Sequence, residues 1–513
     1  MQQPGADTWL LPDTLQVDAL LAALAAEFGC EAAPEYAALV VYADSFDWRL
    51  YQQGYLLHCH GSSWTLYHGD SCEVTVQQGG PELKTSCFAH QFPPGRLRET
   101  LTPVLGVRSL LPLAPVQLSG RQVRLLNSDQ KTVARLVLET QQPAGQGTMF
   151  RLIRLFPIRG YDQELTLVQR ILADNGVRHS ASPLIGFEEG CRKAGRQPLD
   201  YSSKFTLELD EASTARQAMT CIYQTLLDSI NRNIPGVLAD WDTEFLHDLR
   251  VAVRRTRSGL SLVKQVLPGE IVARFKRDFG LLGSLTGPTR DLDVYLLNRA
   301  AYLKRLPPAL QPGLDAFFGE LARRRQTEQK RLVRALRGKK SKAMLVAWSR
   351  CLHGQDRQPA PLAATPIREL AGRIILRRYK RVLQNGQALS AATPDSEVHR
   401  LRIECKKLRY AMEFFSSLYP KEEIQQVVRH LKKLQDILGD FNDLSVQQQM
   451  LRQALEELRV GSRRNLEQAS ALGGLLQSLF EEQQALRDHF AEAFDQFSDP
   501  ATTALSHELF RKI

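Results

Sequence analysis

The chain has 513 residues, of which 43% are hydrophobic and 24% are charged. This length predicts two or three domains, and the composition is typical of a soluble globular protein. No apolar run approaches the roughly 20 residues of a membrane-spanning helix, and the first residues lack the basic segment of a secretory signal. Eight cysteines without a CxxC pair favour reduced thiols over a disulfide framework. We therefore expect a cytoplasmic protein with no membrane partner.

The net charge of +10 is distributed unevenly along the chain. Residues 1–205 contain 18 Lys and Arg against 20 Asp and Glu, whereas residues 206–513 contain 48 against 36. Such an asymmetry indicates an anionic partner for the C-terminal part, attracted by the summed field as well as by individual contacts.

Residues 39–209 are predicted to form an antiparallel sheet or barrel. Short runs such as AALVVYAD, SWTLYHG and TVARLVLET alternate or stay apolar over four to eight residues, and Gly or Asn-Ser-Asp separates them. Helical periods at residues 15–28 and 163–173 interrupt this pattern. A strand with the sequence KFTLELD, at residues 204–210, is expected to close the region.

Beyond residue 211 the pattern becomes helical throughout. Pro and Gly separate the predicted helices, which span residues 212–232, 243–266, 271–285, 291–303, 308–337, 341–352, 367–389, 396–418, 421–438, 444–460 and 468–497. The Pro- and Gln-rich stretch 354–366 is the candidate linker between two helical units. We expect four helices in each unit, the natural count for a bundle.

One segment of the helical part occurs twice, at a fixed spacing of 152 residues. The first copy is His247-Asp-Leu-Arg250-Val-Ala-Val-Arg254-Arg255-Thr-Arg257, and the second is His399-Arg-Leu-Arg402-Ile-Glu-Cys-Lys406-Lys407-Leu-Arg409. The register continues without a gap, since Pro268 matches Pro420, Gly287 matches Gly439, and Arg290-Asp291-Leu-Asp-Val matches Asn442-Asp443-Leu-Ser-Val. A gapless match of this length indicates one structural unit used twice.

Each copy places a His and a ladder of cations on one side of a helix, at positions i, i+3, i+7 and i+10. Mutual repulsion costs roughly a few tenths of a kcal/mol per adjacent pair in water, and more when the charges are shielded from it. The ladders therefore predict a bound anion. The alternative is a solvated face neutralised by acids. Asp248 is the only acid between residues 247 and 264, whereas Glu404 and Glu413 accompany the second ladder.

This pattern, HxxRVxxRRxR followed by a helix that begins RDLDV, resembles the CHAD family, the conserved-histidine α-helical domains. The resemblance covers both half-repeats, from about residue 211 to the C-terminus. It implies two pseudo-symmetric four-helix bundles whose basic faces line a central groove or pore, with inorganic polyphosphate as the ligand. Carried over position by position, it implies polyphosphate contacts from His247, Arg250, Arg254, Arg255, Arg257, Lys264, His399, Arg402, Lys406, Lys407, Arg409, Arg429, Lys432 and Lys433.

A second resemblance concerns the N-terminal part. It rests on Tyr42-Ala-Asp44-Ser-Phe-Asp47-Trp-Arg49-Leu50 with the strand after it, on Pro157-Ile-Arg159-Gly160-Tyr161, and on KFTLELD. These segments are similar to CYTH domains, the triphosphate-tunnel barrels often fused ahead of CHAD domains. The ExExK motif of that family is missing near the start. Because tunnel catalysis needs carboxylates that hold a divalent metal, we predict a degenerate CYTH-like domain over residues 1–208. A CHAD domain follows over residues 209–513, with half-repeats at about 209–353 and 367–513.

The polar residues of the repeat have more than one interpretation. His247 and His399 favour phosphate donation, with a structural imidazole as the alternative, because no Cys or second His stands at the spacing of a metal set. Asp291 and Asp443 favour helix N-caps that also orient an Arg of the ladder, with metal binding as the alternative.

Other polar residues lie outside the two ladders. His58 and His60 share one strand face, with His68 across a predicted hairpin; lining of the sheet is favoured over a zinc site. Basic stripes within residues 323–337 and 373–381 are predicted either to continue the groove or to face solvent.

The sequence therefore predicts an α+β protein whose helical domain binds inorganic polyphosphate electrostatically, without a metal or cofactor. Association with polyphosphate granules, or a scaffolding role, comes from the resemblance alone. One alternative is an RNA- or DNA-binding module, disfavoured because the neighbours of the ladders are mostly aliphatic and base recognition uses stacking platforms. The other is a metal-dependent triphosphatase in the N-terminal domain. The missing ExExK motif disfavours it, so we expect no enzymatic activity.

Overall fold

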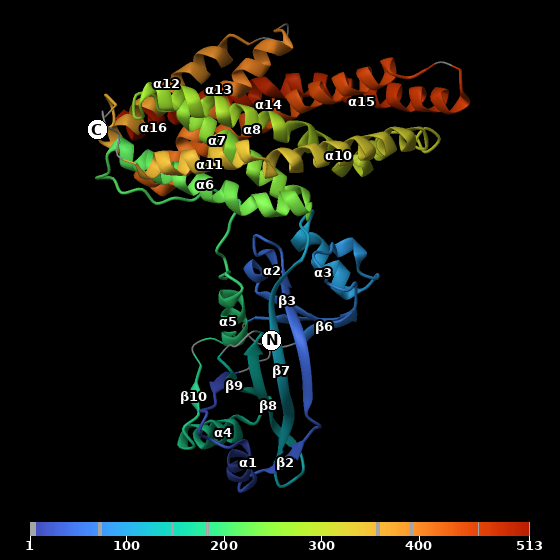
Figure 1. Ribbon diagram of the computed structural model, residues 1–513, viewed down its shortest axis with the longest axis vertical. Coiled ribbons are helices and arrows are strands. Elements are labelled where there is room, and N and C mark those ends of the chain that lie inside the picture. The colour runs from blue at the N-terminus through green and yellow to red at the C-terminus, as the bar shows by residue number, and fades with distance from the viewer. Residues whose placement is uncertain are drawn as a thin grey trace. The chain divides into compact units, whose positions relative to one another are not determined.

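The computed structural model describes residues 7–69, 74–144, 148–180, 182, 184–354, 360–389, 393–459 and 461–511. The chain divides into two compact units, Met1–Lys204 and Phe205–Ile513. The first is built on a β-sheet, and the described residues of the second form only helices and their connections (Figure 1). The predicted change from strands to helices is therefore confirmed. No helix in the described part of the chain is long and apolar enough to cross a membrane.

The described residues of the first unit form one antiparallel sheet of ten strands. Nine strands pair in the order β10-β1-β9-β8-β7-β3-β4-β5-β6, and β2 pairs with β7. The strands are β1 Asp7–Leu10, β2 Gly29–Ala32, β3 Tyr36–Asp44, β4 Tyr55–His60, β5 Ser63–His68, β6 Val74–Gly79, β7 Leu111–Leu126, β8 Thr132–Pro143, β9 Phe150–Pro157 and β10 Arg178–His179. The predicted antiparallel sheet is confirmed.

The long hairpin of β7 and β8 forms the centre of this sheet. Its turn is set by Asn127, whose side-chain Oδ1 accepts hydrogen bonds from the backbone N–H groups of Asp129 and Lys131 at 3.1 and 2.9 Å. Within β7, a Cβ at Gly120 would lie 2.2 Å from the carbonyl oxygen of Leu138, so only glycine fits where the two strands approach.

Helices cover the sheet and complete its core. They are α1 Val17–Ala25, α2 Arg49–Gln52, α3 Arg96–Leu105, α4 Asp162–Asp174 and α5 Ile185–Lys193, with a 3-10 turn, η1, at Ala89–Gln91. Helices α1 and α4 were predicted from their periods. The other three were not predicted, because α2 is short, Pro103 lies inside α3, and Gly186 and Gly190 lie inside α5.

The second unit contains eleven helices among its described residues. They are α6 Ala215–Ala239, α7 Thr243–Leu262, α8 Gly269–Leu297, α9 Arg299–Lys304, α10 Gly313–Arg337, α11 Lys339–His353, α12 Ile367–Gln387, α13 Asp395–Phe415, α14 Lys421–Glu456, α15 Arg463–Ser498 and α16 Pro500–Arg511, with a 3-10 turn, η2, at Ser416–Leu418. Of the predicted linker 354–366, residues 355–359 lie outside the described residues.

The repeat is visible in where these helices begin. Helices α12, α13 and α14 each start 152 residues after α6, α7 and α8, which is the spacing of the sequence repeat. The two halves join through a core that includes Leu292 and Phe317 from the first half with Leu444 and Leu472 from the second. The duplicated sequence therefore folds into duplicated structure, packed into one unit.

Three predictions about elements are wrong. Residues 204–210 form no strand; the backbone N–H of Leu209 instead donates to Oγ of Ser417, and Phe205 packs on Phe414. The breaks predicted between residues 285 and 291 and between residues 438 and 444 do not occur, and α8 and α14 run through Gly287-Pro288 and Gly439. Buried side chains on both sides of these residues outweigh their low helix propensity. Among the described residues, each half has five helices of twelve residues or more, where four were expected.

Candidate functional site

The two ladder helices, α7 and α13, pack against each other. Helix α7 is started by Asp242, whose carboxylate accepts hydrogen bonds from the N–H groups of the first turn. Arg255 on α7 donates from Nε and Nη2 to Oε2 of Glu413 on α13, at 3.2 and 2.8 Å. The Arg254 guanidinium lies 5.8 Å from the ring centroid of Tyr410 on α13. The two copies of the repeat therefore meet at their ladders.

In the first copy, the ladder lies along α8. Nη1 of Arg250 donates to the carbonyl oxygen of Gly283 at 3.2 Å and to Oγ1 of Thr286 at 3.1 Å. Both acceptors are neutral, so they orient the guanidinium without neutralising it. Arg250 is half-buried, whereas Arg254 and Arg257 are exposed.

A stripe of glycines on α8 makes room for these side chains. Gly280, Gly283 and Gly287 stand at i, i+3 and i+7, and a Cβ at Gly287 would lie 3.4 Å from Nη1 of Arg250. The stripe borders a cavity of about 210 Å³, lined by Arg250, Val253, Arg254, Arg257, Gly283, Ser284 and Thr286. Its three arginines were predicted from the sequence, whereas Gly283, Ser284 and Thr286 were not, although the spacing of the glycines opposite an arginine ladder was a usable signal.

In the second copy, side chains of α14 hold the ladder more tightly. Nη2 of Arg402 donates to Oδ1 of Asp443 at 3.1 Å. Arg409 donates to Oε1 of Gln435, the residue that occupies the repeat position of Gly283, at 3.4 Å. In the second copy, therefore, hydrogen-bond acceptors on α14 bind the arginines where the glycines of α8 leave open space in the first copy.

The cations of the two copies act on one another electrostatically. Burial lowers the pKa of Arg250, Asp291 opposes this shift, and Arg254 adds to it. Burial likewise lowers the pKa of Arg402, against Asp443 and with Arg254. For Lys406, burial together with Arg402 and Arg254 lowers the pKa to about 8. Arg254 of the first copy thus lies close enough to disfavour the charge of two cations of the second.

Asp291 and Asp443 are not helix N-caps, so that prediction is wrong. Helices α8 and α14 are continuous across them. Burial raises the pKa of Asp291, Arg250 and Arg290 oppose the rise, and Asp443 adds to it. The ion pair with Arg402 gives Asp443 the arginine-orienting role that was predicted alongside capping, whereas Asp291 acts on Arg250 and Arg290 through its charge.

The two histidines lie beside their ladders in different surroundings. His247 is half-buried on α7, and His399 is exposed on α13. Nδ1 of His399 is hydrogen bonded to Oδ1 of Asn442 on α14. In the described part of the chain, no group of three or more His, Cys, Asp or Glu side chains is placed to hold a metal ion.

Several predicted contacts are paired with acids or lie apart from the cluster of Arg250, Arg254, Arg402 and Lys406. Glu413 binds both Arg255 and Arg409, and Glu404 binds Lys407 at 2.7 Å. Lys264 follows the end of α7 and is exposed. Arg429, Lys432 and Lys433 are exposed on α14, and Lys433 donates to Gln496 on α15.

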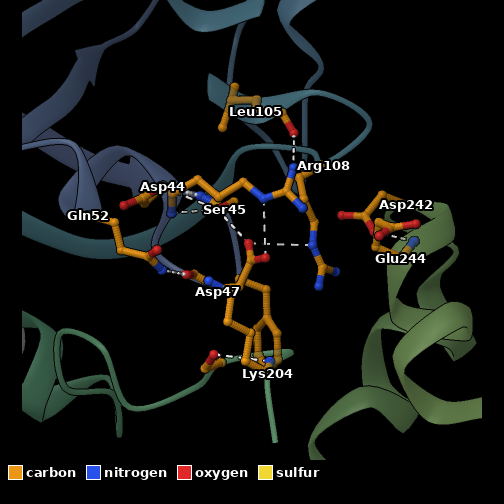
Figure 2. A network of polar contacts seen from close by, with 12 residues as sticks. Asp44, Ser45, Asp47, Gln52, Leu105, Arg108, Lys204, Asp242 and Glu244 are labelled. Carbon is orange, nitrogen blue, oxygen red and sulfur yellow. Dashed lines mark hydrogen bonds and ion pairs between the residues drawn. The ribbon is translucent and has the colours of Figure 1, made fainter. Parts of the chain in front are cut away.

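The acids of the N-terminal motif form a network that builds α2 (Figure 2). Asp44 accepts hydrogen bonds from two backbone N–H groups of α2, and burial raises its pKa to about 7. Asp47 is ion-paired with Arg49 and with the buried Arg108. Burial alone would raise the pKa of Asp47, but the two guanidinium groups hold it below its usual value. These residues end β3 and start α2.

The histidines of β4 and β5 do not converge on one point. Burial lowers the pKa of His58 to about 4. Nδ1 of His60 is hydrogen bonded to the carbonyl oxygen of Leu39 at 2.9 Å, and His68 pairs with Tyr55 rather than with His58. His58 is half-buried, whereas His60 and His68 are exposed, so the three rings lie in different environments.

Comparison with known proteins identifies the helical part. Residues 221–452, from within α6 to within α14, match the model of the CHAD domain, so this part of the chain is a CHAD domain. Two similar solved structures are the CHAD domain from the plant Ricinus communis and PptA from Streptomyces chartreusis. The first is 24% identical, with a TM-score of 0.43, over 60% of this chain and 96% of that one. The second is 18% identical, with a TM-score of 0.45, over 55% and 100%. No curated protein matches the sequence. The likeness of the N-terminal part to CYTH domains stays a prediction.

Proposed function

We propose that the helical unit binds inorganic polyphosphate, held electrostatically beside the contact of α7 and α13. The observation that carries the proposal is the cluster of Arg250, Arg254, Arg402 and Lys406, drawn from equivalent positions of both copies. Burial and mutual repulsion disfavour the charges of three of these side chains. A polyanion offsets this cost, because each phosphate unit brings a negative charge and acceptor oxygens to the cluster.

A polyphosphate chain fits this site better than a nucleic acid. Base recognition in single strands uses exposed aromatic platforms. Tyr410 is the aromatic side chain at the ladders, and it is buried beneath Arg254 with 6% of its surface exposed. Apart from its three arginines, the cavity is lined by Val253, Gly283, Ser284 and Thr286, none of which is aromatic. Phosphate groups are therefore what these residues can recognise.

The proposed role is binding without hydrolysis, at a polyphosphate granule or as a scaffold. Neither a metal nor a cofactor is needed, because the protein supplies the positive charge itself. Incubation of the full chain with tripolyphosphate and Mg²⁺ or Mn²⁺ is expected to release no orthophosphate. Release that exceeds the rate without protein would replace this proposal with the triphosphatase alternative.

Titration of the full chain with long-chain polyphosphate over a salt series tests the proposal. The logarithm of the affinity is expected to fall linearly with the logarithm of salt concentration, by about 0.7 for each phosphate contact. The variant Arg254→Ala with Lys406→Ala should lose far more affinity than Arg377→Ala with Lys380→Ala, which removes two exposed cations from α12. Equal losses in the two variants would mean that net charge, and not this site, binds the ligand.

A further inference from the structure

A second group of cations lies where α10 ends and α11 begins (Figure 1). Residues 322–343 contain ten Lys and Arg and a single acid, Glu328. Three of the ten are ion-paired: Arg323 with Glu320, Arg325 with Asp240 and Asp293, and Arg331 with Glu328. The other seven are exposed, and their side chains have no ion pair in the described part of the chain. We call these seven the basic corner: Arg324, Lys330, Arg334, Arg337, Lys339, Lys340 and Lys342.

The other half-repeat carries the opposite charge at the matching place. Arg325 on α10 bonds Asp293 on α8, and Gln483 on α15 bonds Ser445 on α14, the residue 152 positions after Asp293. Arg325 and Gln483 are therefore equivalent, 158 residues apart. Shifted by 158, residues 322–343 become residues 480–501, which contain six acids and only one cation, Arg487. The two halves share a fold but differ in the sign of this corner.

The start of α11 adds to the unbalanced charge. Lys339, Lys340 and Lys342 lie in its first turn, where the helix dipole is positive, and the N-cap residue Gly338 has no side chain to accept from the free N–H groups. At the start of α16, by contrast, Asp499 accepts from the N–H groups of Ala501 and Thr502, at 2.9 and 3.2 Å. A carboxylate therefore caps the start of α16, whereas the start of α11 carries three cations and no side-chain cap.

We infer that the basic corner is a second contact for polyphosphate, so that a long chain bound at the ladders extends over the first half-repeat and not over the second. This inference rests on the proposed function of the ladders. The ligand is again a bare phosphate chain, because residues 319–347 contain no aromatic side chain on which bases could stack. Because the two half-repeats carry opposite charge at this corner, a long polyphosphate chain has a single preferred side of the domain.

The test compares two triple variants of the full chain that remove the same charge. The corner variant is Lys330→Gln, Arg334→Gln and Arg337→Gln, which lie on one stripe of α10. The control variant removes three other exposed cations that have no ion pair in the described part of the chain: Arg377→Gln and Lys380→Gln on α12 and Arg452→Gln on α14. All six side chains are exposed, so both variants are expected to unfold thermally like the wild type. The affinities for tripolyphosphate, for long-chain polyphosphate and for RNA of matched charge are measured over a salt series.

The corner variant is expected to bind long-chain polyphosphate about tenfold more weakly at low salt, with a salt slope shallower by about two, and to bind tripolyphosphate as the wild type does. Equal losses in the control variant would overturn the inference, since position would not matter. An equal loss for tripolyphosphate would also overturn it, because the corner would then be the primary site. A greater loss for RNA of matched charge would make the occupant a nucleic acid. If the wild type binds neither polyphosphate, the proposed function itself fails.

Discussion

The two copies of the ladder place cations at the same register but treat them differently. Arg250 of the first copy is oriented by a backbone carbonyl and a hydroxyl beside a stripe of glycines. Arg402, its counterpart 152 residues later, is ion-paired with Asp443. Arg257 faces the open space beside Gly283, whereas its counterpart Arg409 is held by Glu413 and Gln435. In the first copy these two arginines have no acidic hydrogen-bond partner in the described part of the chain, whereas in the second copy both are paired with acids.

The position of a cation in the repeat and its availability for a ligand are therefore separate properties. The period of the helix fixes where a cation lies, whereas the acids of neighbouring helices decide whether it is already neutralised. Arg255 and Lys407 illustrate the second property. They occupy equivalent positions and both face acids, Glu413 and Glu404. They were predicted as contacts from the resemblance, and we now expect them to contribute less than Arg250 and Lys406, for which the described part of the chain holds no ion pair.

We expect the greatest loss of affinity from Arg250→Ala combined with Lys406→Ala. Each side chain is half-buried beside the ligand site and has no ion pair in the described part of the chain, and each charge-assisted contact to phosphate is strong in such surroundings. We expect the affinity for long-chain polyphosphate to fall about 100-fold, measured by calorimetric titration at one fixed salt concentration.

A repeat-matched pair serves as the control for this variant. Arg255→Ala with Lys407→Ala removes the same number of charges from the same two helices, and its expected loss of affinity is about threefold or less. If the control pair lost as much affinity as the first pair, the distinction between presented and neutralised cations would be wrong.

A smaller effect is expected from pH. The neighbouring cations and burial lower the pKa of Lys406 to about 8, and bound polyphosphate favours its protonated form. Binding should therefore take up a proton wherever Lys406 is neutral beforehand. The affinity is expected to be constant below about pH 7 and to fall about tenfold by pH 9. Lys406→Arg keeps the charge at both pH values and should flatten this profile. An unchanged profile in that variant would assign the titration to another group.

The fold was predictable wherever one local pattern was sufficient. The spacing of 152 residues foretold where α12, α13 and α14 begin, and Pro268 and Pro420 mark the starts of α8 and α14. The prediction failed where tertiary packing outweighed local propensity. Pro288 and Gly439 indicated helix breaks, but each helix continues because both of its flanks are buried. The strand predicted at residues 204–210 failed because alternation alone cannot tell a paired strand from an extended segment.

The candidate site was predictable in its cations but not in their partners. His247, Arg250, Arg254 and Arg257 could be placed on one face of a helix because helical geometry depends on sequence separation alone. The contact of Arg255 with Glu413 joins residues 158 positions apart, and no local pattern encodes such a pair. The same holds for Tyr410 beneath Arg254. Sequence therefore gave the charges, and structure is needed to say which of them are neutralised.

The smallest expected effect on binding comes from Glu413→Gln. This carboxylate neutralises Arg255 of the first copy and Arg409 of the second, so its loss makes both guanidinium groups available to an anion. Gln keeps the shape and one acceptor oxygen, and we expect the affinity for polyphosphate to rise about threefold. The free energy of unfolding, measured with urea, should fall by about 1–3 kcal/mol, because the side chains of Arg255 and Glu413 are both mostly buried. A loss of stability without a gain in affinity would show that the two arginines do not reach the ligand.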